Sequence, residues 1–105
     1  NGGAIPTDYG AYGYAGVGSL LAAIEAAGGT DTDKVVDALE KLQYDLTKGP
    51  QHYRKCDHQS VQSVLVLESK KKSAMANDND LFAILANDAG SDDMLRSCSE
   101  LGHAA

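Results

Sequence analysis

YRKCDHQSVQSVLVLESKKK, residues 53–72, contains the clearest strand signal of the chain and one of its two cysteines. The apolar run VLVL, residues 64–67, predicts a strand buried on both faces, because neither face would carry a polar side chain. We expect this strand to cover residues 61–69. A shorter strand over residues 51–54 precedes it, and KCDHQS, residues 55–60, forms the turn between them.

Two helices are predicted before this strand pair. The first, residues 8–27, has apolar side chains at helical spacing and a short oxygen-bearing residue, Thr7 or Asp8, to cap its start. Gly28 ends this helix. The second helix, residues 30–45, carries one apolar stripe, which consists of Val35, Val36, Leu39 and Leu42.

The first predicted helix contains three glycines at regular spacing, Gly10, Gly13 and Gly16. Each weakens a helix by roughly 1 kcal/mol relative to alanine, so their spacing predicts another backbone packed closely against this face. GYAGVG, residues 13–18, does not predict a nucleotide site, because a dinucleotide-binding loop lies between a strand and a helix.

After the strand pair, residues 70–80 form a polar loop and LFAILA, residues 81–86, is predicted to be a strand. DDMLRSCSEL, residues 92–101, predicts a last helix, capped by Ser91 or Asp92. The order of elements, α-α-β-β-β-α, indicates the α+β class. A length of 105 residues is enough for one small domain.

The composition excludes some classes of protein. The formal net charge is −6, which argues against nucleic acid as a partner, because nucleic-acid-binding proteins normally present a basic face. No stretch approaches the run of about eighteen apolar residues that a membrane span needs. No secretory signal is visible, and because the chain begins with Asn1 instead of Met, we expect a processed, designed or partial chain.

The two cysteines, Cys56 and Cys98, leave several interpretations open. They are compatible with a disulfide, with two buried free thiols, or with a zinc site that includes His58, His103 and the nearby His52. The spacings C-x-H and C-x4-H are not common zinc-finger pairings. A nucleophile and base formed by Cys56 and His58 is a further alternative, although no oxyanion-hole motif accompanies them.

Residues 6–45, PTDYGAYGYAGVGSLLAAIEAAGGTDTDKVVDALEKLQYD, resemble the late helical pair of the type I periplasmic solute-binding proteins. These proteins serve the branched-chain amino acid class of ABC importers and their relatives for amides, urea and aromatic acids. In that family the second helix ends in an apolar-aromatic-Asp element that is followed by Gly-Pro, as at residues 42–45 and 49–50 of this chain. Residues 49–70 are similar to the family segment that begins at this Gly-Pro. RSCSELGH, residues 96–103, resembles the C-terminal end of one branch of the family. The resemblance covers the last quarter to third of a complete member.

The resemblance implies a two-lobe α/β protein whose lobes are joined by three crossover strands. A small solute such as an amino acid would bind in the cleft between them, hinge closure would trap it, and the closed form would meet an ABC permease in the periplasm. Within this chain it implies a helical pair over residues 1–48, crossover strands over 49–88 and a C-terminal helix over 89–105. It implies neither catalysis nor a cofactor.

The resemblance also implies roles for individual residues. The start of the first helix lies towards the cleft in such folds, so Tyr9 and Tyr12 are candidate ligand contacts, with helix packing as the alternative role. An oxidising periplasm favours a disulfide between Cys56 and Cys98.

Several rival functions remain from the sequence alone. One is a small zinc- or thiol-dependent protein that uses Cys56, His58, Cys98 and His103, and another is a receptor ectodomain built on the same fold. A third is an interaction module that docks a partner on the glycine face. If the chain folds alone, its exposed apolar faces predict a homo-oligomer.

Overall fold

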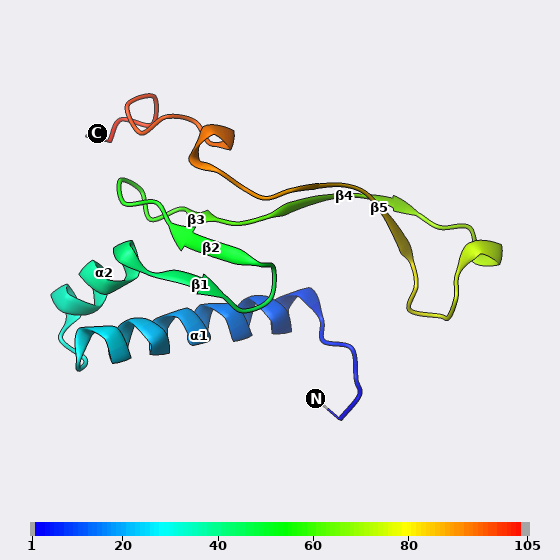
Figure 1. Ribbon diagram of the computed structural model, residues 1–105, viewed down its shortest axis with the longest axis horizontal. Coiled ribbons are helices and arrows are strands. Elements are labelled where there is room, and N and C mark those ends of the chain that lie inside the picture. The colour runs from blue at the N-terminus through cyan, green and yellow to red at the C-terminus, as the bar shows by residue number, and fades with distance from the viewer. Residues whose placement is uncertain (1, 104–105) are drawn as a thin grey trace.

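A computed structural model of the chain, described over residues 2–103, places two helices before two small antiparallel sheets (Figure 1). The α+β class predicted from the sequence is confirmed. The predicted segments 1–48 and 89–105 extend slightly beyond the described residues, which do not include Asn1, Ala104 and Ala105. The elements are α1 (Asp8–Ala27), α2 (Thr32–Lys41), β1 (Gln43–Asp45), β2 (Pro50–Tyr53), β3 (Ser60–Val61), β4 (Val64–Ser69), β5 (Phe82–Asp88) and two 3-10 turns, Lys72–Ala74 and Asp92–Met94.

Three of the four helix ends lie where the capping residues of the sequence predict them. Thr7 Oγ1 accepts the N–H of Gly10 at 3.2 Å to cap α1, and Asp31 Oδ1 accepts the N–H of Lys34 at 3.2 Å to cap α2. Gly28 ends α1 in the left-handed conformation with φ of 70°. At the fourth end, α2 stops at Lys41, because Leu42 is already extended.

Residues 43–45 form a strand and not the end of a helix, so the predicted helix of residues 30–45 was too long. β1, β2 and β3 form an antiparallel sheet in that order. The ring of Tyr44 on β1 stacks on Tyr53 of β2, with centroids 5.5 Å apart. Tyr53 in turn places its hydroxyl 2.9 Å from Ser19 Oγ on α1. These cross-strand and sheet-to-helix contacts hold residues 43–45 extended.

The buried core of this helix-and-sheet part is small. The buried apolar side chains among the described residues are Ala23 on α1, Val35 on α2 and Val61 on β3. No backbone or side chain outside the local helix approaches a Cβ built on Gly13 or Gly16 within 4 Å. The predicted close packing on the glycine face is therefore absent from this structure.

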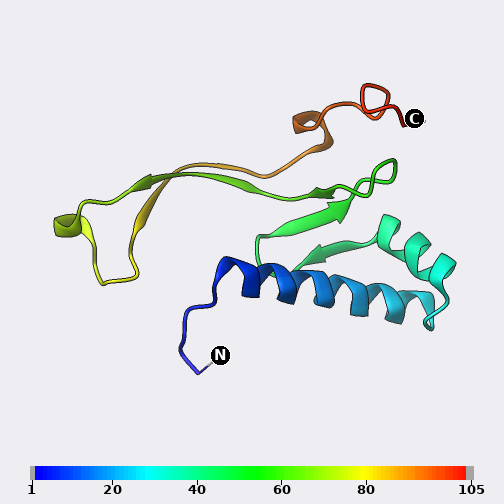
Figure 2. The same ribbon diagram turned by 180° about the vertical axis from the view of Figure 1, so that it is seen from behind.

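β4 and β5 form a two-stranded arm, residues 64–88, that projects away from the helices (Figures 1 and 2). The register runs from Val64 opposite Asp88 to Ser69 opposite Phe82. At the tip, Lys70 Nζ lies 2.6 Å from Asp80 Oδ1.

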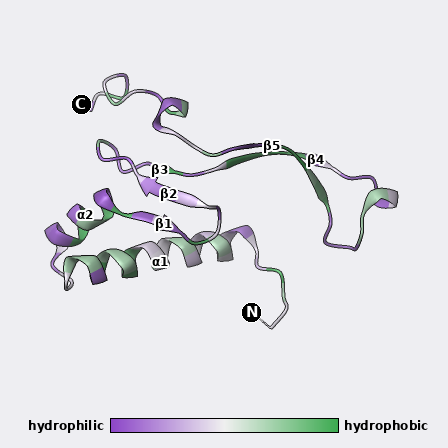
Figure 3. Ribbon diagram, viewed as in Figure 1, coloured by the Kyte–Doolittle hydropathy of each residue, from purple (hydrophilic) through white to green (hydrophobic). Residues whose placement is uncertain are grey.

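The arm is exposed on both faces. Every residue of β4 is exposed, and on β5 the side chain of Ile84 is 63% exposed. Figure 3 shows the hydrophobic colour along both strands. The prediction that the run at residues 64–67 is buried on both faces is wrong for this chain by itself, because among residues 2–103 only β5 pairs with β4 and neither face of β4 is covered.

The dimensions of the molecule agree with this open arrangement. The radius of gyration is 17.1 Å, whereas a compact domain of this length has about 13 Å. The accessible surface is 7771 Å², against about 5,600 Å² for a folded monomer of this mass. Among residues 2–103, no helix combines the length and the apolar character needed to cross a membrane.

The single strand predicted over residues 61–69 is divided in two. β3 ends at Val61, which pairs with His52 of β2, and β4 starts at Val64, which pairs with Asp88 of β5. Gln62 and Ser63 are thus the point where the chain leaves one sheet and enters the other.

The last helix, predicted over residues 92–101, is not formed. The segment contains one 3-10 turn, Asp92–Met94, followed by a single turn in which Leu101 N–H bonds to the carbonyl of Ser97. Two constraints compete with a helix here. The Arg96 carbonyl accepts a side-chain donor from β2–β3, and Cys98 is tied to the same region.

Candidate functional site

A hollow of about 630 Å³ lies where α1, the β1–β2 loop and the root of the arm meet. We call it the elbow hollow. Its lining consists of apolar side chains from the arm and polar groups from the three neighbouring segments, namely Tyr12, Thr47, Lys48, Gln62, Ser63, Val64, Leu65, Leu67, Ile84 and Asn87. Its size is in the range of pockets that hold small molecules.

Lys48 and Tyr12 form the polar side of the elbow hollow. The Lys48 ammonium lies 5.3 Å from the centre of the Tyr12 ring, a cation–π contact between the β1–β2 loop and the first turns of α1. Ser63 Oγ donates to the Lys48 carbonyl oxygen at 2.7 Å, which ties the loop to the root of the arm. No carboxylate in the described part of the chain is within ion-pair distance of Lys48.

The two tyrosines predicted from the sequence are placed differently. Tyr12 lines the elbow hollow, whereas Tyr9 does not and is 85% exposed. Neither side chain is buried against another element of this chain. Their role as ligand contacts therefore stays a prediction, and the structure brings only Tyr12 to a hollow.

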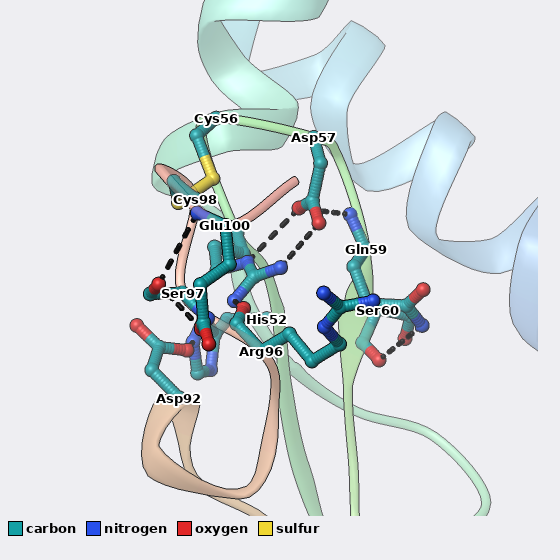
Figure 4. Close-up of polar contacts among 11 residues, drawn as sticks. His52, Cys56, Asp57, Gln59, Ser60, Asp92, Arg96, Ser97, Cys98 and Glu100 are labelled. Atoms are coloured by element: carbon teal, nitrogen blue, oxygen red, sulfur yellow. Dashed lines mark hydrogen bonds and ion pairs between the residues drawn. A yellow bond between two sulfur atoms is a disulfide. The ribbon is translucent and has the colours of Figure 1, made fainter. Parts of the chain in front are cut away.

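A second polar cluster fastens the C-terminal segment to the β2–β3 turn (Figure 4). We call it the C-terminal clamp. Cys56 and Cys98 form a disulfide with Cα atoms 6.1 Å apart, within the usual range for such bridges. Arg54, only 8% exposed, donates from Nη1 to the Arg96 carbonyl at 2.8 Å and from Nε to Asp57 Oδ1 at 3.0 Å. Its Nη2 pairs with the other Asp57 oxygen.

The disulfide decides between the interpretations of the cysteines. The predicted bridge between Cys56 and Cys98 is confirmed. The zinc- or thiol-dependent alternative is wrong for these residues, because sulfurs bonded to each other are neither free ligands nor nucleophiles. His58 and His103 do not form part of a metal site either. Among the residues that the structure describes, no group of three metal-binding side chains occurs.

Electrostatics within the clamp follow from these contacts. The Arg54 guanidinium, helped by the Gln59 N–H at 3.1 Å, holds the pKa of the Asp57 carboxyl far below its ordinary range. On the other side of the turn, His58 Nε2 lies 3.1 Å from Glu40 Oε1 of α2 and lowers the pKa of that carboxyl. The turn between β2 and β3 is therefore linked both to α2 and to the C-terminal segment.

The C-terminal segment has further attachments to the same sheet. His52 Nε2 of β2 lies 3.1 Å from Asp92 Oδ1. A Cβ at Gly90, where φ is 76°, would clash with the carbonyl oxygen of Gln62, so the chain leaving β5 passes directly against the point where it entered β4. The two ends of the arm therefore lie close together at its base.

Sequence reasoning missed Lys48, Ser63 and Asn87 as lining residues of the elbow hollow. No periodicity connects the β1–β2 loop with the root of the arm, and the strand break at Gln62 has no local signal. The one available hint was the Gly-Pro at residues 49–50, which marks a turn beside Lys48.

Comparisons with known proteins agree on one kind of relative. A family model described as periplasmic binding protein matches residues 1–74. The crystal structure of a periplasmic binding protein from Burkholderia mallei is similar to 83% of this chain, with 30% sequence identity and a TM-score of 0.76. The chain covers 23% of the length of that protein. A search of curated proteins finds no match.

Proposed function

The chain belongs to the periplasmic binding protein family, and on that premise we propose that it is the C-terminal portion of the solute-binding component of an ABC importer. The complete protein would capture an amino acid or a related small solute in the periplasm and would have no catalytic activity. Its partners would be the solute and a membrane permease. The disulfide of the clamp suits an oxidising compartment of this kind.

The observation that carries the proposal is the uncovered arm. β4 and β5 carry exposed large apolar side chains on both faces, among them Val66 and Leu85. Such strands are typical of sheets covered on both sides. The accessible surface exceeds that of a compact chain of this mass by about 2,000 Å², which is the size of a substantial interface.

A crossover strand between two lobes accounts for this exposure. In the proposed protein the arm leaves the helix-and-sheet part and enters the other lobe, where the remainder of the polypeptide covers both faces. The break at Gln62 and Ser63 between β3 and β4 is then the natural hinge, since backbone there belongs to neither sheet. The clamp at Cys56 and Cys98 would keep the two strands of the arm moving together.

The elbow hollow would form one wall of the cleft. It opens between the start of α1 and the root of the proposed crossover, so closure about Gln62 would change its width. Tyr12 would contact the solute through its ring and hydroxyl, and Tyr9 would face the opposite lobe. The second wall would come from the part of the protein beyond this chain.

A chimaera tests the proposal. The matching portion of the Burkholderia mallei protein is replaced by this chain, and thermal unfolding is followed with and without a panel of small solutes. One cooperative transition that a solute shifts upward, with a smaller radius of gyration in solution scattering on binding, would support the proposal. A chimaera whose arm stays uncovered and whose unfolding no solute alters would contradict it.

A further inference from the structure

We infer that Gly90 is a positioning residue of the hinge. Because it has no side chain, the two connections of the arm can meet at one point, and this contact sets the direction in which the arm leaves the helix-and-sheet part. The inference rests on the proposed function, in which the arm is the crossover between two lobes. The direction of the arm would decide how far the cleft stands open before a solute binds.

The two connections are in direct backbone contact, and Figures 1 and 2 show them side by side. A Cβ at Gly90 would lie 2.3 Å from the carbonyl oxygen of Gln62. The hydrogen that a side chain would replace therefore points at this oxygen. Gly90 also has a left-handed φ of 76°, and its N–H donates to Asp88 Oδ1 at 3.2 Å, which holds the turn at the end of β5. Glycine satisfies both the conformation and the contact.

On the helix-and-sheet side, both connections are anchored at the same residue, His52 of β2. Val61, the last residue of β3, pairs with His52 in the sheet. The His52 side chain lies 3.1 Å from Asp92, where the chain has returned from the arm (Figure 4). His52 thus holds the chain just before it enters the arm and just after it leaves.

On the other side, the two connections enter the base of the arm. The first pair of the arm is Val64 with Asp88, so Gln62 and Gly90 each lie two residues outside it. A hollow of about 230 Å³ lies beside their contact and leaves room for the strands to shift. A short segment between two fixed ends is where a hinge absorbs its change of backbone angles.

A side chain at position 90 would turn the arm by a measurable angle. A Cβ there would be about 1 Å too close to the Gln62 carbonyl oxygen for ordinary van der Waals contact. Two residues of extended chain, about 7 Å, separate Gly90 from Asp88, so a shift of this size corresponds to a turn on the order of 10°. The exposed hydrogen bond from Ser63 Oγ to the Lys48 carbonyl opposes the turn, but a single bond of this kind contributes little net free energy.

The test measures the direction of the arm in the 105-residue chain by residual dipolar couplings of the backbone amides. The couplings of β4 and β5 are compared with those of α1 and α2. Gly90→Ala should turn the arm by on the order of 10° relative to the helices. Gly90→Asn should turn it by a similar angle, because asparagine tolerates positive φ but carries the same Cβ.

Gly102→Ala is the matched control. Gly102 has a positive φ of 82°, but no described atom beyond its chain neighbours lies within 4 Å of its Cβ position, so the arm should keep its direction. The wild-type direction in both Gly90 variants, the wild-type direction in Gly90→Asn alone, or an equal turn in Gly102→Ala would each overturn the inference. These results are separate from the chimaera, which reports on covering of the arm and on solute binding whatever the role of Gly90.

Discussion

Removal of the clamp disulfide should cost a large share of the chain's stability. The bridge joins Cys56 to Cys98 across a sequence separation of 42. The entropy of closing a loop of that length corresponds to about 4 kcal/mol at 25 °C. The closed loop contains the whole arm, and the bridge adds to the contacts of Arg54 with the Arg96 carbonyl and of His52 with Asp92, which also hold the C-terminal segment against β2 and the β2–β3 turn.

Urea unfolding followed by circular dichroism measures this effect on the double variant Cys56→Ser/Cys98→Ser. We expect the unfolding free energy to fall by up to about 4 kcal/mol. The urea dependence of the transition should become steeper, because the unfolded chain without the bridge is less compact and exposes more surface. Wild-type chain kept in a thiol reductant serves as the control and should lose the same amount. In both samples the C-terminal segment should exchange its amide hydrogens faster.

A loss below about 1 kcal/mol would refute the reasoning. It would mean that the remaining contacts of the C-terminal segment, from Arg54 to the Arg96 carbonyl and from His52 to Asp92, hold the segment without the bridge. A reduced wild type that differs clearly from the serine variant would point instead to the free thiols as the cause.

Three further predictions follow from the described contacts. Gly90→Ala should destabilise the chain by about 1–3 kcal/mol more than Gly102→Ala. Both glycines have positive φ, but only the methyl group added at Gly90 meets the Gln62 carbonyl. Equal losses of unfolding free energy in urea would contradict this. Asp57→Asn should destabilise most at neutral pH and least in strong acid. In the folded chain the pKa of the Asp57 carboxyl lies below its ordinary value of 3.8. The charged carboxylate therefore stabilises the fold fully above pH 3.8, and this stabilisation disappears as the pH falls below it. A difference in stability between wild type and Asp57→Asn that does not change with pH would contradict this prediction. Ile84→Lys should lower self-association of the isolated chain in light scattering, since that side chain is 63% exposed on the arm; a monomeric wild type at all concentrations would show that the exposed arm does not drive association.

Local chemistry was sufficient to predict much of the helical part. An oxygen-bearing cap at Thr7 and a left-handed glycine at Gly28 define α1, and both are encoded within a few residues. The strand at residues 82–88 was also predictable in kind, because a short apolar run between Asn/Asp clusters favours a strand.

Long-range constraints account for what the sequence did not reveal. The stacking of Tyr44 on Tyr53 turns the expected end of α2 into a strand. The disulfide and Arg54 prevent a helix near Cys98. The burial of Val64 and its neighbours was predicted from a pattern that is correct for a covered sheet, but no part of the chain that the structure describes covers this pair of strands.

The candidate site was predictable only in part. The start of α1 was expected to face a ligand, and Tyr12 does line a hollow. Lys48 was not predicted as a lining residue, because no sequence pattern connects the β1–β2 loop with the root of the arm.

Hydrogen exchange of the arm, measured by mass spectrometry, tests the central claim most directly. The amides of β4 and β5 are compared in the isolated chain and in the chimaera with the Burkholderia mallei protein. The proposed crossover predicts fast exchange in the isolated chain and strong protection in the chimaera, where the rest of the polypeptide covers both faces. Equal, fast exchange of the arm in both proteins would contradict its role as a crossover between lobes.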